Sequence, residues 1–286
     1  MIQIGDIQIT YITDGTMHAD VGGPFGLVPR ALYRKYLEPD AENMVPLTLH
    51  CLLVKAAGKT IVVDTGFGEK LTDQMKKVFR LERPRGGLLD GLARIGIRPG
   101  DVDMVIDSHL HGDHCAGNTV FKADMSGVEA TFPNAEYIAQ RREYDDAMHP
   151  NERNRPTYIA INYQPLVETG QMRLIDGDTE ILPGVFGVIT RGHTPAHMSI
   201  RFESQGQHGL FLADLASYAV HFEKLAWMTA YDIEPMQTLE TKRRWQAWAL
   251  ETNAILMFQH DPNILAGHLR KDGEKLSIQP FQVTLA

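Results

Sequence analysis

The chain has 286 residues, of which 43% are hydrophobic, and its formal net charge is −8 at pH 7. This composition is enough to bury a substantial core, whereas the negative charge disfavours binding to nucleic-acid phosphates or anionic lipid. No run approaches the ~18 apolar residues of a membrane span, and the first residues lack the pattern of a secretory signal. We therefore expect a soluble cytoplasmic protein without nucleic-acid or membrane partners.

The chain begins with two short runs in which apolar and polar residues alternate, at 2–4 and 7–11, and this pattern predicts a hairpin. The segment 15–46 is rich in Gly and Pro but also carries Phe25 and Leu27. A long loop with apolar residues is typical of a lid or a substrate-binding loop, and a surface loop packed by its own side chains is an equal alternative.

Strands and helices mix along the rest of the chain. Apolar runs predict strands within the ranges 47–56, 60–66, 103–108, 172–213 and 254–259. Helical patterns cover the ranges 69–80, 87–96 and 235–252, and the last is expected to bury Met236, Leu239, Ala247 and Leu250. Because no linker rich in Gly, Ser or Pro divides the chain, we expect a single layered α/β domain over residues 1–286.

The strongest functional signal comes directly after the predicted strand 103–108. Three imidazoles and one carboxylate lie within six residues there, at His109, His111, Asp113 and His114. Neutral imidazole and carboxylate are the usual ligands of zinc and its first-row neighbours, and a loop at a strand end can point such side chains toward one place. The alternative is a histidine-rich surface loop that binds nothing.

Three further residues of ligand type end later predicted strands, namely His193, Asp214 and His260. Taken singly, a strand-end aspartate is usually a turn cap and a lone histidine is usually an ordinary polar residue. Open α/β sheets place their sites at strand ends, however, and all three residues follow this rule. Together with the first motif, they predict a metal site with seven ligands.

The order and spacing of these residues, with VVDTGFG at 62–68, resemble the metallo-β-lactamase superfamily over nearly the whole chain. Within it, the chain is similar to the N-acyl-homoserine lactonases, or quorum-quenching lactonases, in GGPFGLVPRALY (22–33), WMTAYDIEP (227–235) and the step 260–261. The resemblance implies a four-layer αβ/βα sandwich with the metals at one edge of its two sheets.

The resemblance also implies two divalent metal ions, with zinc the first expectation and iron, manganese or cobalt as alternatives. It assigns three ligands to each ion and one shared ligand: His109, His111 and His193 to the first, Asp113, His114 and His260 to the second, and Asp214 to both. Asp64 matches a structural position beneath the site. His197 lies beside His193 in the sequence, and we expect it to support that ligand.

A hydrolase that opens lactone rings is the implied activity, and N-acyl-homoserine lactones, which are small-molecule substrates, are the expected class. In this scheme a metal-bound hydroxide attacks the ester carbonyl, so no serine nucleophile is needed. Asp113 or Asp214 would pass the proton to the leaving alkoxide.

The group that orients the carbonyl cannot be carried over directly. The related lactonases have a tyrosine three residues after the bridging aspartate, where this chain has Ser217. Tyr218, His221 and Tyr231 are the candidates for this role.

An acyl chain would need apolar surface near the metals. The candidates for this surface are Phe25, Leu27, Trp227, Met228 and Tyr231. Ordinary core packing is an alternative explanation for Trp227 and Met228.

Two other functions remain open from the sequence. A phosphotriesterase, like the methyl-parathion hydrolases, or another esterase would use the same metals. A non-catalytic ligand sensor would keep the fold, but a degenerate site would have lost ligands and all seven are present. The sequence leaves open whether the protein forms a homodimer.

Overall fold

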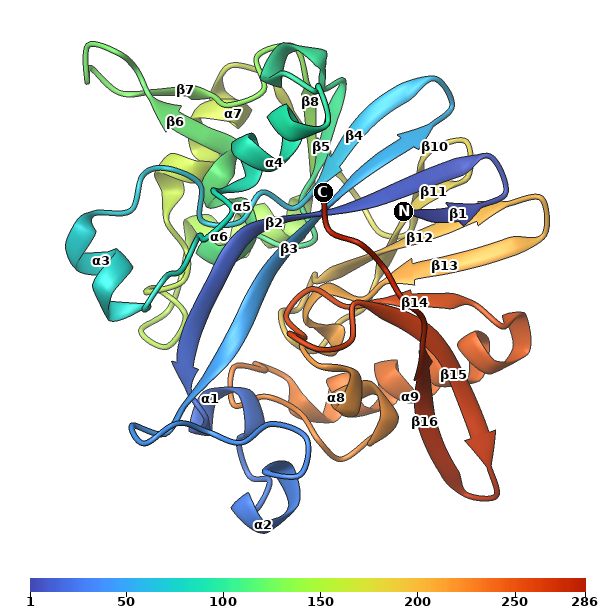
Figure 1. Ribbon diagram of the computed structural model, residues 1–286. Helices are drawn as coiled ribbons and strands as arrows, with labels where there is room; N and C mark the ends of the chain where they lie inside the picture. The colour runs from blue at the N-terminus through green and yellow to red at the C-terminus, as the bar shows by residue number, and fades with distance from the viewer.

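The computed structural model describes residues 1–286, and two seven-stranded sheets face each other at its centre (Figure 1). The first sheet contains, in spatial order, β1 (Ile2–Ile4), β2 (Ile7–Asp20), β3 (Met44–Ala56), β4 (Lys59–Val63), β5 (Met104–Ile106), β8 (Glu136–Gln140) and β9 (Met172–Ile175). The second contains β10 (Thr179–Leu182), β11 (Val185–Ile189), β12 (Met198–Ser204), β13 (Gln207–Phe211), β14 (Ile255–Met257), β15 (Ala266–Asp272) and β16 (Lys275–Pro280). A small separate hairpin pairs β6 (Thr119–Phe121) with β7 (Val128–Ala130).

The α-helices are mostly short. They are α1 (Gly22–Phe25), α2 (Arg30–Tyr33), α3 (Asp73–Val78), α4 (Leu88–Arg94), α5 (Gly112–Cys115), α6 (Arg141–Met148), α7 (Gln164–Glu168), α8 (Ala219–Glu223) and α9 (Pro235–Thr252). None of them combines the length and the apolar character that crossing a membrane would require.

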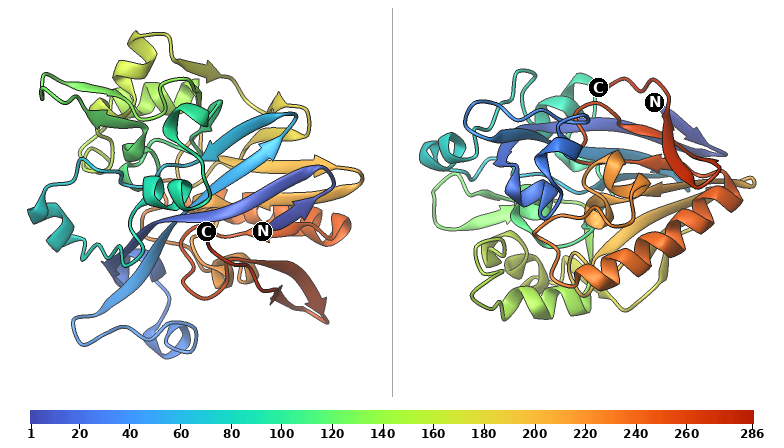
Figure 2. Two further views of the ribbon diagram at one scale, coloured as in Figure 1. Left: turned by 45° about the horizontal axis from the view of Figure 1, so that its top comes forward. Right: turned by 90° about the horizontal axis from the view of Figure 1, so that it is seen from below.

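Three hydrophobic cores separate four layers of structure. Strand residues alternate between cores: Leu52 and Val54 of β3 point into the core between the two sheets, whereas Cys51 and Leu53 point to the opposite face. That opposite face packs against α4, α6 and α7, and the outer face of the second sheet packs against α8 and α9. Figure 2 shows α9 lying along the outside of the second sheet. The expected four-layer αβ/βα sandwich is thereby confirmed.

The predicted loop 15–46 is shorter in the structure. β2 continues to Asp20 and β3 begins at Met44, because the two strands remain paired to that point, with Asp20 opposite Met44. The strands stay paired despite an irregularity in register between Thr13 and Thr16, whereas the Gly and Pro residues of the segment had suggested a loop. The connection therefore covers only 21–43 and contains α1 and α2.

Helix α9 has the predicted length, but the predicted buried stripe is only partly correct: Leu250 packs against the core and Leu239 is half-buried, whereas Met236 and Ala247 are exposed. Met236 is 69% exposed, and the residues that α9 buries are Thr238, Lys242, Trp245, Gln246 and Ala249. Lys242 is fully buried because its Nζ donates to backbone carbonyls at the end of α8, including that of His221 at 3.0 Å. These carbonyls satisfy the ammonium group, so a lysine can lie on the buried face of α9.

Candidate metal centre

The seven predicted ligands meet at one end of the sandwich, on four segments that follow β5, β11, β13 and β14. Their ligand atoms form three overlapping groups, and within each group all the atoms lie within 4.8 Å of one another. The groups are His109, His111 and His193; His109, His114 and Asp214; and Asp113, His114 and His260. All seven are buried except Asp113, which is half-buried.

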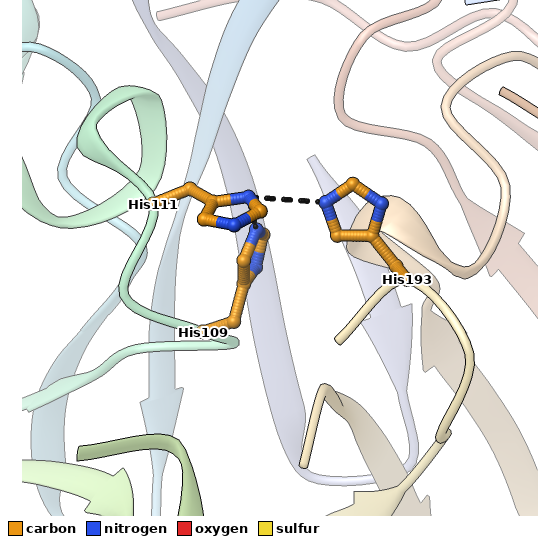
Figure 3. A group of neighbouring side chains, drawn as sticks. All are labelled: His109, His111 and His193. Carbon is orange, nitrogen blue, oxygen red and sulfur yellow. Dashed lines mark hydrogen bonds between the residues drawn. The ribbon is translucent and has the colours of Figure 1, made fainter. Parts of the chain in front are cut away.

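The first group consists of three imidazoles that converge from two segments (Figure 3). Nδ1 of His111 lies 3.0 Å from Nε2 of His109 and 3.1 Å from Nε2 of His193. Zinc–nitrogen bonds of about 2.0–2.1 Å in a tetrahedron would place such nitrogens roughly 3.3 Å apart. The spacing of the three nitrogens therefore suits a small divalent cation.

Asp214 lies between this group and that of Asp113, His114 and His260, which is called the second ligand group below. Its Oδ2 is 3.1 Å from Nε2 of His193, and its Oδ1 is 3.0 Å from Nε2 of His260. The latter nitrogen is in turn 3.3 Å from Nε2 of His114. One carboxylate thus faces ligands of both groups, which is the position that a bridging ligand needs.

The outer ring nitrogens of four histidines are held by hydrogen bonds, and this directs their Nε2 atoms inward. The pairs are His109 with Ser108 Oγ at 3.1 Å, His114 with Asp64 at 3.0 Å, His193 with Asp232 at 3.0 Å, and His260 with the Thr48 carbonyl at 2.7 Å. In a neutral ring, an Nδ1 that donates to such a partner leaves the Nε2 lone pair for a metal.

The charges around the site favour a cation. Burial and the neighbouring His114 and His111 hold the pKa of His109 well below its usual value, so this ring is neutral, as a ligand must be. Burial alone would raise the pKa of Asp214, but His260 and His193 outweigh it and keep the carboxylate ionised. The donor set, its spacing and its charge all fit two divalent ions.

Asp64 occupies a structural position beneath the site, as the resemblance implied. Its carboxylate accepts hydrogen bonds from the backbone N–H of Ser108 at 2.7 Å, from the hydroxyl of Ser108 at 2.9 Å and from His114. The residue has φ of +54°, which is uncommon for a residue other than glycine and is the kind of backbone strain found at functional sites.

The residue that holds the outer ring nitrogen of His193 is Asp232, which the sequence did not predict. His197 does not contact the outer nitrogen of His193; its Nε2 accepts the backbone N–H of Asp214 at 3.0 Å, and its Nδ1 pairs with the Thr190 hydroxyl at 2.8 Å. Asp232 supports His193 instead. Asp232 lies within the 227–235 segment, but nothing in the local pattern distinguished this acid from a turn residue.

Two of the three candidates for orienting a carbonyl are enclosed. Tyr218 is buried, and its hydroxyl donates to the Pro46 carbonyl at 2.8 Å. The His221 ring is buried beside the rings of Phe25 and Tyr218, at centroid distances of 5.2 and 5.3 Å. Burial lowers the pKa of His221 to about 3, so it is neutral near pH 7.

The third candidate, Tyr231, reaches solvent and is 43% exposed. Burial of its hydroxyl end raises its pKa to about 12, and the negative charges of Asp113 and Asp214 act in the same direction. The hydroxyl end of Tyr231 lies against Gly23, where any larger side chain would collide with it. Tyr231 is therefore a protonated donor whose pKa is raised in part by the charges of Asp113 and Asp214.

The substrate candidates fall into different environments. Phe25 is 1% exposed and stacks between Tyr33 and Tyr218, at centroid distances of 4.8 and 5.6 Å. Leu27 is fully exposed, and Trp227 is half-buried with its ring edge-on to Phe25. The segments 22–33 and 227–235 therefore touch, as the hydrogen bond from the Ala230 N–H to the Gly23 carbonyl at 2.8 Å also shows. Half-buried Met228 lies in the second of them.

Comparison with known proteins agrees with this geometry. The sequence profile of the metallo-beta-lactamase superfamily matches residues 45–268. An N-acyl homoserine lactonase of Bacillus thuringiensis is 29% identical over 231 residues, which are 77% of this chain and 83% of that protein. The crystal structure of a probable metal-dependent hydrolase from Staphylococcus aureus matches with a TM-score of 0.89 and 30% identity, over 100% of both chains.

A likeness in fold alone extends to AidC, a dizinc quorum-quenching lactonase solved in complex with a product. It matches with a TM-score of 0.81 and 20% identity, over 99% of this chain and 97% of that one. With the profile match covering most of its length, the chain belongs to the metallo-β-lactamase superfamily and is a metal-dependent hydrolase.

Proposed function

We propose that this hydrolase is a dinuclear lactonase that opens N-acyl-homoserine lactones and uses zinc. The observation that carries the proposal is the position of Asp214, whose two oxygens face one histidine from each ligand group. Two bound cations would supply an activated water and polarise an ester carbonyl. The named activity of the Bacillus thuringiensis relative supports the lactone as substrate.

Asp214 and Asp113 have different proposed roles in the reaction. Asp214 is buried, and its negative charge would offset the repulsion between two cations held by the neighbouring histidines. The side chain of Asp113 is 24% exposed and lies 3.6 Å from Nε2 of His114. This exposure allows Asp113 to exchange protons with solvent, and we assign to it the delivery of a proton to the leaving alkoxide.

We propose that the Tyr231 hydroxyl donates a hydrogen bond to the carbonyl oxygen of the substrate. Its hydroxyl stays protonated at neutral pH, and the charges of Asp113 and Asp214 contribute to its raised pKa. A donor aimed at the oxygen that gains charge in the transition state contributes more than one that only binds the ground state. The Tyr218 hydroxyl already donates to the Pro46 carbonyl, which leaves it no proton for a substrate.

The acyl chain would lie against the two segments that meet at Gly23 and Ala230. Trp227 and Met228 are half-buried and Leu27 is exposed, so each offers apolar surface to a ligand. Phe25 is buried behind this surface and would act through the packing of Tyr218 and Trp227 rather than by contact.

A substrate panel tests the proposal directly. The purified protein is stripped of metal, reloaded with zinc and assayed on lactones of several acyl lengths, a thioester, a phosphotriester and a β-lactam, with zinc per chain measured by elemental analysis. We expect two zinc ions per chain and fastest turnover of the acyl-homoserine lactones. Rapid cleavage of the phosphotriester with lactones at background would replace the lactonase by a phosphotriesterase.

A further inference from the structure

Glu143 of α6 is a buried acid that belongs to none of the three ligand groups. Its carboxylate accepts three hydrogen bonds, from the Tyr158 hydroxyl at 2.8 Å, from the Leu110 backbone N–H at 3.2 Å and from the Thr194 hydroxyl at 2.6 Å. Burying a carboxylate is costly unless such bonds satisfy it. Three donors from three distant segments therefore indicate a position that the fold is built to hold.

Each of the three donors adjoins a histidine of the first ligand group. Leu110 lies between His109 and His111, and Thr194 directly follows His193. The Tyr158 ring lies against the His111 ring at a centroid distance of 4.9 Å. One carboxylate thus links both segments that supply the three imidazoles of Figure 3.

The second ligand group has a different set of supports. His114 is held by Asp64, and His260 is held by the carbonyl of Thr48. Neither of these two contacts involves Glu143. A substitution at Glu143 should therefore lower the metal affinity of the three-histidine group more than that of the second ligand group.

We propose that Glu143 is a positioning residue that sets the separation of the His109–His111 segment from the His193 segment, and thereby the affinity of the three-histidine group for its metal. The inference rests on the proposed dinuclear site. In Glu143→Gln the amide N–H₂ can donate to the Thr194 hydroxyl while the amide oxygen accepts from Leu110, but both bonds lose the charged acceptor and become weaker. The two segments are then held less firmly, and a shift of a few tenths of an ångström is enough to weaken a metal site.

Zinc titration of the metal-free protein against a competing chelator tests this proposal, since it reads each metal without relying on activity. We expect Glu143→Gln to weaken one zinc by about 10- to 100-fold and to leave the other unchanged. Glu136→Gln, the same change at an exposed position of β8, is the matched control and should bind zinc as the wild type does. Equal weakening of both zincs, or no weakening of either, would overturn the proposal.

A double variant identifies the metal that is affected. His193→Ala removes a ligand of the three-histidine group, so adding Glu143→Gln to it should not weaken the remaining zinc further. Further weakening would contradict the assignment. If Glu143→Gln does not fold, Thr194→Val removes a single hydrogen bond with little change of shape and should show the same selectivity to a smaller degree.

The wild-type titration separates this inference from the proposed function. A wild type that binds two zincs but opens no lactone refutes the substrate and leaves the role of Glu143 to be decided by its own variants. A wild type that binds a single zinc refutes the dinuclear site and, with it, the selectivity claimed for Glu143.

Discussion

Asp232 accepts a hydrogen bond from Nδ1 of His193 over 3.0 Å, and both side chains are buried. Asp232 also accepts a hydrogen bond from the Thr229 hydroxyl at 2.9 Å, so the orientation of its carboxylate is fixed. We expect Asp232→Ala to free the His193 ring and reduce zinc affinity or kcat/KM by about 10- to 100-fold. Thr229→Val, which removes only the outer bond, should have a smaller effect, and wild-type zinc affinity in Asp232→Ala would contradict the role.

Asp214 is predicted to hold both metals. Replacing it with alanine removes the one carboxylate that faces ligands of both groups, so we expect loss of activity together with lowered occupancy of both metals. Elemental analysis of the purified variant measures the occupancy. Full activity with two metals per chain in Asp214→Ala would refute the bridging assignment.

The two tyrosines near the site make a matched pair for testing the carbonyl donor. Tyr231→Phe removes a hydroxyl whose pKa is raised in part by Asp113 and Asp214, and we expect kcat to fall by about 100-fold with little change in KM. Tyr218→Phe removes a hydroxyl bound to the Pro46 carbonyl, and its effect should be limited to a modest loss of stability. The reverse outcome, with Tyr218→Phe the slower enzyme, would transfer the role to Tyr218.

The seven ligands could be predicted from sequence because each one follows a strand whose apolar character is local. The facing of the β3 residues, with Leu52 and Val54 on one side and Cys51 and Leu53 on the other, came only from the structure. Strand β2 was cut short in the prediction because its last residues are held by pairing with β3 rather than by an alternating pattern. Pairing between distant segments has no signature in a local window.

The supporting residues could not be predicted for a related reason. Glu143 lies 33 residues from Leu110 and 51 from Thr194 along the chain, and only the folded structure brings their atoms together. Lys242 reads as an exposed charge in a helical pattern, yet the carbonyls that bury it belong to α8 and the loop after it. Polar groups that are satisfied over long sequence distances break the hydrophobic pattern without any local sign.

Lys242 should make the stability of the protein depend on pH. Burial lowers its pKa from 10.5 to about 8, so between those values the unfolded chain binds more protons than the folded one and the free energy of unfolding rises with pH. The full contribution is up to about 3 kcal/mol across this window. Lys242→Met should remove this rise when denaturant unfolding is compared at pH 7 and 10, whereas Lys271→Met, at an exposed position, should keep it.

Acyl-chain length is expected to control catalytic efficiency if the chain lies on the surface near Trp227. Each methylene that becomes buried contributes about 0.8 kcal/mol, so kcat/KM should rise roughly fourfold per methylene until the surface is covered. Trp227 is half-buried, with its ring edge-on to Phe25 at 6.2 Å and to Tyr36 at 5.5 Å, so its free face is fixed in place.

Trp227→Ala should therefore flatten the rise, lowering kcat/KM for long-chain lactones far more than for short ones. Trp248→Ala is the matched control, because Trp248 is also half-buried but packs in the core between α9 and the second sheet. This control should lose stability without changing the dependence on chain length. An equal loss at every chain length in Trp227→Ala would show that the residue supports the fold of its segment and does not contact the acyl chain.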